Sequence, residues 1–596
     1  TYGDDAIRIV SENPYKLSED IRGIGFISAD TIARKLGIAE DSIIRAEAGV
    51  NYCLLEMANS GHCGMPYDEL VEESVKLLSI SPSIIKTAIT NNANARKVVM
   101  DKLGVVGNEE ADFVFLSSYY YFEKEIAHML HLLSAGTVPW MQLEPATISE
   151  PETKCNIDIE KAIEWVQDKN SIRLDVVQIE AIRTALSSKV MVITGGPGTG
   201  KTTIIKSILS ILGAKKIKVK LCAPTGRAAK RLKETTGEEA LTLHRLLDVN
   251  PSTGKFFYNA ENPLNCDYLI VDETSMIDVQ LFYHLLKSLP LRSAILLVGD
   301  VDQLPSVGPG EVLKSIISSE VISTVKLTQI FRQAGTSDII KNAHLINQGV
   351  IPDFRTKPSK SDNNADETNQ TQLSDFYFIE SKAGEDYINT LIELVQERIP
   401  KKFHVDPIKQ LQILCPMQRG GTGVRSLNIE LQKALNPLSS TGIGVTKFGQ
   451  TFAIGDKIMQ LENNYEKEVY NGDIGFIKNV DHELQEVLVE FETVSDEENK
   501  LVSYDFSELD EITLAYATTI HKSQGSEYPV VVVALTMQSF LMLKRNLIYT
   551  AVTRGKKLVV ILGEKKALAI AVKNFKNIER HTKLKDWLLK EFRQSA

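Results

Sequence analysis

The sequence has little cysteine, no long apolar run and no strong excess of one charge. Six of the 596 residues are cysteine, and none has the C-x-x-C spacing of a zinc or redox site. We therefore expect reduced thiols in a protein core rather than disulfides or zinc ligands. The longest apolar stretches, such as 530–535, fall far short of the ~18–20 residues of a membrane-spanning helix, and the N-terminus has no basic-then-apolar signal sequence. These absences predict a cytoplasmic protein.

Length and composition predict an ordinary protein of several domains. The net charge is −10, with 43% hydrophobic and 24% charged residues. Non-specific nucleic-acid binding needs lysine and arginine to neutralise phosphates, so any polynucleotide would have to follow a local basic track. Basic runs are more often solvated faces than binding sites. Three such runs are candidates: 215–220, 227–233 and 545–557.

Residues 195–202 read Gly-Gly-Pro-Gly-Thr-Gly-Lys-Thr, a complete G-x-x-x-x-G-K-S/T phosphate-binding loop. A β-branched run precedes it, and a segment with helical spacing of apolar residues follows it. The backbone N–H groups of such a loop turn toward phosphates at the positive end of the helix. We predict that Lys201 contacts the β- and γ-phosphates of a nucleoside triphosphate and that Thr202 binds Mg²⁺. The alternative is a tight strand-to-helix connection without a ligand.

Two further apolar runs end in residues suited to phosphoryl transfer. Tyr268-Leu-Ile-Val-Asp-Glu places Asp272 to hold Mg²⁺ and Glu273 to orient and deprotonate the attacking water. The alternative is an acidic strand terminus. Leu297-Val-Gly-Asp-Val-Asp-Gln brings Gln303 to the same edge, where its amide can sense the γ-phosphate. A motor needs this last segment, whereas an ordinary kinase does not.

Alternation of apolar runs with helical patterns predicts βαβ units and parallel sheets. The first unit should contain strands at 190–194, 219–223, 268–271 and 294–299. The second should contain strands near 411–415, 530–534 and 558–562. A strand-rich stretch, 451–511, interrupts the second unit and is expected to be a small inserted barrel. The polar stretch 357–375 is expected to be a linker or loop.

The N-terminal part reads as helical, with 41–135 expected to continue as helices. Residues 21–37 predict helix, glycine turn, helix, in which Ile21-Arg-Gly-Ile-Gly-Phe exposes amides that can hold a DNA phosphate. An ordinary helical hairpin fits this pattern equally well. Farther along, 248–258 predicts an inserted β-hairpin. Its aromatic residues, Phe256 to Tyr258, either stack on bases or form the hairpin's own core.

These motifs resemble those of superfamily 1 helicases, specifically the RecD-like branch that translocates 5′ to 3′. The resemblance covers nearly the whole chain and includes the segments 176–181, 223–229, 242–247, 327–333, 515–527 and 549–555. It implies that Gln178 reads adenine and that Arg332 and Arg554 point at the γ-phosphate. The N-terminal glycine turn resembles the helix-hairpin-helix region of stand-alone RecD-like proteins. Such proteins usually carry more sequence before this region, so we expect that sequence upstream of Thr1 is missing from this chain.

The resemblance completes the candidate sites. The expected catalytic residues are Lys201, Asp272, Glu273, Gln303, Arg332 and Arg554, with Thr202 and Asp272 as metal ligands. The expected ATP-binding residues are Gln178, Gly195, Gly196, Pro197, Gly198, Thr199, Gly200, Lys201, Thr202, Thr203, Gly525 and Glu527. The expected DNA-binding residues are Pro224, Thr225, Arg227, His244, Phe256, Phe257, Thr519 and His521.

The implied fold is α/β, with two RecA-like parallel-sheet domains, an N-terminal α-helical region and a small inserted SH3-like β-barrel. The expected limits are 1–140 for the N-terminal region, 141–334 for the first RecA-like domain with a strand-splitting pin near 247–262, 335–450 with 512–596 for the second, and 451–511 for the SH3-like domain.

The implied function is that of an ATP- and Mg²⁺-dependent 5′–3′ DNA helicase. It would translocate on single-stranded DNA and separate forked or tailed duplexes, in DNA repair or recombination. Two alternatives stay open at this point. One is a DNA-bound ATP switch that remodels complexes without separating strands, and the other, which leaves Gln303 and 514–529 unexplained, is a metabolic kinase.

Overall fold

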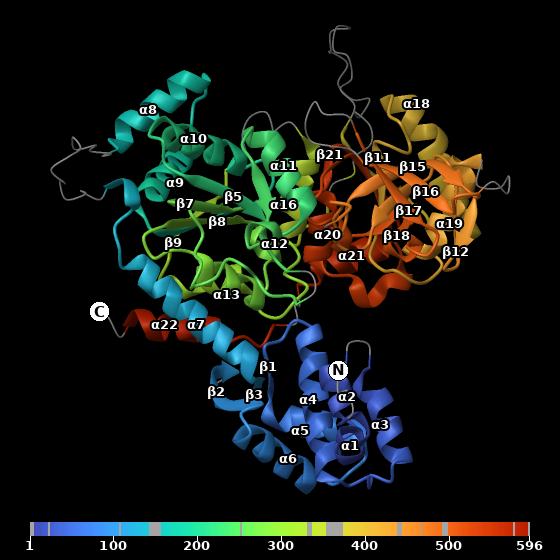
Figure 1. Ribbon diagram of the computed structural model, residues 1–596. Coiled ribbons are helices and arrows are strands. Elements are labelled where there is room, and N and C mark those ends of the chain that lie inside the picture. Colours follow the sequence, from blue (N-terminus) through green and yellow to red (C-terminus); the bar gives the residue numbers. More distant parts are fainter. Residues whose placement is uncertain are drawn as a thin grey trace, which may run out of the picture.

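Two α/β units stand side by side, and an N-terminal module lies beneath the first of them (Figure 1). The computed structural model describes residues 5–21, 24–106, 109–141, 157–250, 253–329, 337–352, 354, 374–437, 444–464, 466–491, 499–575 and 579–593. Arg332, most of the polar stretch 357–375 and part of the N-terminal glycine turn lie outside the described residues. None of the described helices combines the length and the apolar character needed to cross a lipid bilayer.

The N-terminal module combines helices with a small antiparallel sheet of order β1-β3-β2. Its helices are α1 (Ala6–Glu12), α2 (Lys16–Asp20), α3 (Phe26–Lys35), α4 (Ile43–Asn59), α5 (Tyr67–Leu78), α6 (Pro82–Asn94) and α7 (Ser117–Ser134). Its strands are β1 (Gly64–Pro66), β2 (Val98–Val106) and β3 (Glu109–Leu116). The expectation that 41–135 continue as helices was therefore wrong at 64–66, 98–106 and 109–116. The physical reason is visible in β3, where Phe113 and Phe115 enter one core and Val114 enters the opposite one.

The first α/β unit is a six-stranded sheet of order β6-β5-β7-β8-β4-β9, in which neighbouring strands are parallel. The strands are β4 (Val190–Gly195), β5 (Val219–Ala223), β6 (Ala240–Thr242), β7 (Tyr268–Val271), β8 (Ala294–Gly299) and β9 (Ser323–Leu327). The helices are α8 (Ile159–Asn170), α9 (Val176–Ser187), α10 (Lys201–Ala214), α11 (Gly226–Thr236), α12 (Leu243–Leu246), α13 (Val279–Ser288) and α14 (Val312–Ser319), with short 3₁₀ turns η2 (Pro139–Met141) and η3 (Thr274–Met276). The predicted parallel sheet is confirmed.

The second α/β unit is a parallel sheet of order β10-β21-β20-β11-β19. The strands are β10 (Phe376–Glu380), β11 (Leu411–Cys415), β19 (Ala517–Thr519), β20 (Tyr528–Leu535) and β21 (Gly555–Gly563). The helices are α16 (Asp338–Asn347), α17 (Glu385–Glu393), η4 (Leu394–Arg398, a π-helix), α18 (Ile399–Phe403), α19 (Val424–Leu435), η7 (His521–Ser523), η8 (Met537–Met542), α20 (Arg545–Val552) and α21 (Lys565–Lys573). Every side chain from Val530 to Leu535 is at most 1% exposed, and burial of each valine or leucine among them contributes ~1.5–3 kcal/mol. Helices cover both faces of the sheet, which is why this run is apolar without alternation.

The inserted β domain is an antiparallel sheet of order β17-β16-β15-β14-β18. Its strands are β14 (Lys457–Gln460), β15 (Ile474–Asp481), β16 (Glu486–Phe491), β17 (Lys500–Asp505) and β18 (Ile512–Leu514), with a 3₁₀ turn η6 (Leu509–Glu511) and a separate hairpin of β12 (Val445–Lys447) and β13 (Gln450–Phe452). Within the described residues no pairing joins β17 to β18, so closure of the expected barrel is not seen. Ile458, Ile477 and Val489 share one core with Val530 and Val532. The insertion therefore extends the core of the second unit.

The C-terminal segment returns to the first unit, although the sequence analysis assigned 512–596 to the second domain. Helix α22 (Leu584–Arg593) packs against α7 and α14, and Figure 1 shows it (red) beside α7 (cyan). Leu584, Trp587 and Leu588 enter the core beneath the first sheet. Just before this helix, Arg580 donates hydrogen bonds to the carbonyl oxygens of Gly308 and Gly310 at 2.9 and 2.8 Å.

A buried ion pair holds the N-terminal helices together. Arg45 of α4 is 2% exposed, and its Nε donates to Asp30 of α3 at 2.8 Å. The hydroxyl of Tyr15 donates to the same carboxylate at 2.7 Å. Burial alone raises the pKa of Asp30, but the hydrogen bonds from Arg45 and Tyr15 outweigh it and hold the pKa below its usual value.

We expect Arg45→Met to destabilise this module by ~1.5–3 kcal/mol, because the Asp30 carboxylate loses its buried charged hydrogen-bond donor and keeps only the half-exposed Arg34 as a cation. Hydrogen exchange of the α3 and α4 amides measures this loss. The control is Arg8→Met, whose ion pair with Asp5 is exposed and should contribute ~1 kcal/mol or less. Equal effects of the two substitutions would contradict the prediction. Because the folded pKa of Asp30 is depressed, its stabilisation is fully present above the unfolded pKa of ~3.9 and is lost as the pH falls through the folded value.

Candidate nucleotide site and nucleic-acid interface

The phosphate loop connects β4 to α10 at the carboxyl edge of the first sheet. Gly198 and Gly200 adopt φ of +72° and +85°, which favour glycine. A Cβ on Gly195 would lie 2.9 Å from the carbonyl oxygen of Leu327, so the loop passes too close to β9 for a larger residue. The Lys201 ammonium donates to the carbonyl oxygens of Gly195 and Gly196. Both ends of the loop are thus held by contacts within the protein itself.

A cavity of about 590 Å³ lies in front of this loop, which is ample for a nucleotide. It is lined by Ile172, Arg173, Gln178, Gly196, Pro197, Gly198, Thr199, Gly200, Lys201, Thr202, Thr203, Arg231, Asp272, Glu273, Gln303, Glu527, Thr553 and Arg554. The structure therefore brings most of the expected ATP-binding and catalytic residues together. Gly195 lies behind the loop at the end of β4. Gly525 lies beside the cavity, where a Cβ would be 2.7 Å from the Thr225 hydroxyl.

The entrance to α9 positions Gln178. Asp175 accepts hydrogen bonds from the backbone N–H groups of Val177 and Gln178. The Gln178 amide oxygen in turn accepts from the Asp175 N–H at 3.3 Å, which completes a capping box. This reciprocal pair fixes the Gln178 side chain at the wall of the cavity.

Two carboxylates follow β7 at the cavity floor. Burial, and then the neighbouring negative charge of Glu273, raise the pKa of Asp272 to about 6. A bound cation would relieve this crowding. The oxygen atoms of Thr202 and Asp272 fit a Mg²⁺ site completed by phosphates and water, because Mg²⁺ in such sites takes only one or two protein ligands. Glu273 has a positive φ of +51°, a left-handed backbone conformation that costs free energy for a residue other than glycine.

The second α/β unit contributes Arg554 to the opposite wall. This guanidinium is 2% exposed and donates to the Gln303 amide oxygen at 3.0 Å, across the cleft between the units. It also donates to the carbonyl oxygens of Thr550 and Ser526 at 3.2 and 3.1 Å. Gln303 is held from behind by Asp300 at 3.1 Å. The Arg554–Gln303 hydrogen bond is therefore a direct side-chain contact between the phosphate-loop wall and the cationic wall.

The sequence analysis did not predict four of the residues that line the cavity, which are Ile172, Arg173, Arg231 and Thr553, or Tyr549, whose hydroxyl lies next to Gly196. Arg231 contacts both Glu273 and Glu527, and Tyr549 donates to Asp300 at 2.8 Å. Arg231 was noted only as one member of a basic run. Spacing along α11 gave no usable signal, because Arg227, four residues earlier, lines a different cavity.

The expected DNA-binding residues fall into three places. Pro224 and Thr225 precede α11, where the Thr225 hydroxyl caps the helix by accepting from the Ala228 N–H at 3.2 Å. Thr519 ends β19, and His521 lines a second cavity of about 280 Å³ together with Leu304, Lys544 and Arg580. His244 lies in α12, near the inserted hairpin.

The inserted hairpin is short, and its two phenylalanines differ in how much of each side chain is exposed to solvent. Val249 and Phe256 form an antiparallel bridge, and 251–252 near its tip lie outside the described residues. The Phe256 ring packs 6.0 Å from the His244 ring and 4.9 Å from the His284 ring. Phe257, by contrast, is 59% exposed. Of the two readings left open for these aromatics, Phe256 fits hairpin core, whereas Phe257 presents a face to solvent.

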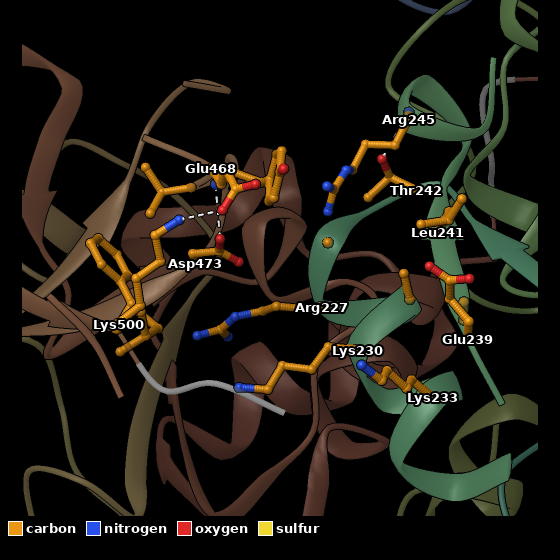
Figure 2. A pocket seen from close by; sticks show the side chains of 17 residues that line it. Arg227, Lys230, Lys233, Glu239, Leu241, Thr242, Arg245, Glu468, Asp473 and Lys500 are labelled. Atoms are coloured by element: carbon orange, nitrogen blue, oxygen red, sulfur yellow. Dashed lines mark hydrogen bonds and ion pairs between the residues drawn. The ribbon is translucent and has the colours of Figure 1, made fainter. Parts of the chain in front are cut away.

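A basic cleft of about 300 Å³ separates α11 from the inserted β domain. We call it the α11 cleft, and the charged residues that line it are Arg227, Lys230, Lys233, Glu239, Arg245, Glu468, Asp473 and Lys500. Figure 2 shows Arg227 and Lys230 extending from α11 toward the β domain, where Lys500 pairs with Glu468. Cationic side chains outnumber acidic ones, as a local phosphate track requires.

Comparison with known proteins adds family matches along the chain. The matching family models are an AAA domain over 178–309, the RecD2 DNA helicase helix-hairpin-helix (HHH) domain over 1–64, the SH3 domain of ATP-dependent RecD-like DNA helicases over 427–491, and the UvrD-like helicase C-terminal domain over 514–562. The ATP-dependent RecD2 DNA helicase of Deinococcus radiodurans is 30% identical over 577 residues, which covers 96% of this chain and 72% of that protein. This chain belongs to the RecD-like DNA helicases.

Two other similarities are more distant. The RecBCD enzyme subunit RecD of Mycolicibacterium smegmatis is 30% identical over 424 residues, covering 66% of this chain and 72% of that protein. The crystal structure of Pif1 helicase from Candida albicans covers 71% of this chain and 100% of that one, with 17% identity and a TM-score of 0.38. That score is too low to support a functional conclusion.

For this helicase we expect Arg554→Ala to lower ATP turnover by about 10³-fold or more, the range for an arginine that stabilises the transition-state charge. Binding of a fluorescent ATP analogue should change little, since Gln178 and the phosphate loop remain. Turnover and equilibrium binding, measured side by side, check both halves.

The control is Arg183→Ala, which removes an exposed arginine of α9 that does not line the cavity and should change neither quantity. Arg554→Lys tests the charge with less disturbance of the fold and should also lose most turnover. Loss of binding together with turnover in both Arg554 variants would assign this arginine a structural role.

Proposed function

We propose that this chain hydrolyses ATP to move 5′ to 3′ along single-stranded DNA and thereby separates forked or tailed duplexes. The observation that carries the proposal is the Arg554–Gln303 contact, which places a cation from one α/β unit beside the phosphate-sensing amide of the other. Family membership supports the helicase activity. The direction of travel and a role in DNA repair or recombination rest on family membership alone.

The proposed chemistry follows from the cavity. Gln178 would hold the base, and the loop from Gly195 to Thr203, with Lys201, would hold the phosphates. Bound Mg²⁺, held by Thr202 and Asp272, would neutralise charge on the phosphate oxygens. Glu273 would accept the proton of the attacking water. Phosphoryl transfer leaves the protein mainly positioning and charge stabilisation, and Arg554, with Arg332 by resemblance, would supply the latter.

The proposed coupling to movement uses the contacts that cross the cleft. Besides Arg554, the Leu304 N–H donates to the Thr550 hydroxyl at 3.0 Å, and Gln524 donates to the Leu304 carbonyl oxygen at 2.9 Å. Loss of the γ-phosphate would weaken the Gln303 side of this network and let the two units separate. Domain motion of this kind is how a motor converts hydrolysis into displacement.

The proposed DNA path includes the α11 cleft and the expected DNA-binding residues around it. Thr225 and Arg227 stand at the start of α11, and Lys230 and Lys500 line the cleft farther along. Phe257 is the exposed aromatic of the hairpin, which we propose as the strand-splitting pin. The proposed domain limits are those of the sequence analysis, apart from the C-terminal helix, which packs with the first unit.

Unwinding of two partial duplexes, one with a 5′ and one with a 3′ single-stranded tail, tests the proposal. We expect ATP-dependent unwinding of the 5′-tailed duplex only, and none with Lys201→Ala, because that substitution removes the phosphate-binding ammonium. Unwinding from the 3′ tail alone would overturn the polarity. DNA-stimulated hydrolysis without unwinding of either duplex would favour the ATP switch instead.

Lys230→Ala tests the DNA path. If Lys230 neutralises one phosphate, the slope of log affinity against log salt should fall by about 0.7, the value for one contact with a single strand. Fluorescence anisotropy of a labelled oligonucleotide at several salt concentrations measures the slope. The control is Lys433→Ala in α19, which pairs with Glu430 outside the cleft. An unchanged slope for Lys230→Ala would place the strand elsewhere.

A further inference from the structure

Arg231 connects two carboxylates that belong to different α/β units. It lies in α11, four residues after Arg227. Its guanidinium is 2.6 Å from the Glu527 carboxylate and 3.4 Å from the Glu273 carboxylate. Glu273 is the proposed water-activating base and follows β7, whereas Glu527 precedes β20 in the second unit. One cation is therefore shared across the cleft.

The two contacts are unequal in a way that matters for catalysis. Charge-assisted hydrogen bonds are strongest at short donor–acceptor distances, near 2.7–2.9 Å. The guanidinium therefore interacts more strongly with Glu527 than with Glu273. A carboxylate paired closely with a guanidinium is a poor base, because the cation lowers the pKa of the carboxylate and occupies its lone pairs. In the closed cleft, Glu527 draws the cation away from the base.

Helix α11 belongs to the first α/β unit, as Glu273 does, and it also packs against the segment of the second unit that carries Glu527. Its first turns press on the segment that carries Glu527, since Arg227 donates to the Ser526 and Tyr528 hydroxyls at 3.0 and 2.6 Å. A Cβ on Gly525 would lie 3.1 Å from that of Ala228, which shows how close this packing is. If the units separated, Glu527 would move with the second unit, and Glu273 would be the one of these two carboxylates that stays in the same unit as Arg231.

We infer that Arg231 is a positioning residue that restrains Glu273 while the cleft is open, and that Glu527 releases this restraint when the cleft closes. The inference rests on the proposed function, in which Glu273 is the base. It predicts that hydrolysis is suppressed until the two units meet. Competition of two carboxylates for one guanidinium would thus link the state of the cleft to the reactivity of the base.

The experiment measures the ATP turnover number with and without single-stranded DNA for Arg231→Gln, Glu527→Gln and the double variant. Arg231→Gln should raise DNA-free turnover by about fivefold or more, the lower end of ordinary coupling between sites, and should reduce the ratio of DNA-stimulated to DNA-free turnover. Glu527→Gln alone should lower DNA-stimulated turnover, because the guanidinium then stays with Glu273. Adding Arg231→Gln to Glu527→Gln should restore much of this loss.

Two results would overturn the inference. One is an equal fall of DNA-free and DNA-stimulated turnover in Arg231→Gln. The other is a double variant no faster than Glu527→Gln alone. Arg183→Gln, which breaks exposed ion pairs of Arg183 in α9 with Glu160 of α8 and with Glu180 of α9, is the matched control and should behave as the unmodified protein. Thermal unfolding of each variant checks the fold.

Glu273→Gln separates this inference from the proposed function. If Glu273→Gln retains turnover, the assignment of the base is wrong, whatever Arg231 does. If Glu273→Gln abolishes turnover, and also abolishes the raised DNA-free turnover when added to Arg231→Gln, the base is correct and the Arg231 effect acts through it.

Discussion

The contact between the Arg554 guanidinium and the Gln303 amide is the interaction on which the nucleotide site depends. A buried guanidinium is costly unless its donors are satisfied, and those of Arg554 are met by Gln303, Ser526, Thr550 and Thr553. Three of these partners belong to the second unit and one to the first. This contact therefore fixes the distance between the two walls of the cavity.

The loop that follows Gln303 carries this constraint to the rest of the molecule. Its Gly310 N–H donates to the Gly61 carbonyl oxygen at 2.9 Å, which ties the loop to the N-terminal module. Arg580 donates to Ser306, Gly308 and Gly310 of the same loop. The C-terminal segment then passes beside His62 and Glu123 on its way to α22. Three parts of the chain that are remote in sequence thus meet at the segment that is proposed to sense the γ-phosphate.

Positive charge is concentrated in two places on a protein whose net charge is negative. The chain as a whole is acidic, yet cationic side chains gather in the α11 cleft and at the phosphate-binding wall. Helix α11 presents Lys230 and Lys233 to the cleft and Arg231 to the nucleotide cavity. Its two faces are therefore proposed to meet two different anions, a polynucleotide on one side and the carboxylates of the nucleotide cavity on the other.

The sequence by itself determined the parallel strands and the phosphate loop, because apolar runs, turns and the glycine–lysine spacing are local properties. Strands β5, β7, β8 and β11 lie at the predicted positions, and Gln178, Lys201, Asp272, Glu273, Gln303 and Arg554 line one cavity. Only the tertiary structure decided the β2–β3 hairpin, the return of α22 to the first unit and the sharing of Arg231 between Glu273 and Glu527. Each of these depends on which distant surfaces pack together. No short segment of the sequence indicates these contacts, because the residues that stabilise them lie from tens to hundreds of positions away along the chain.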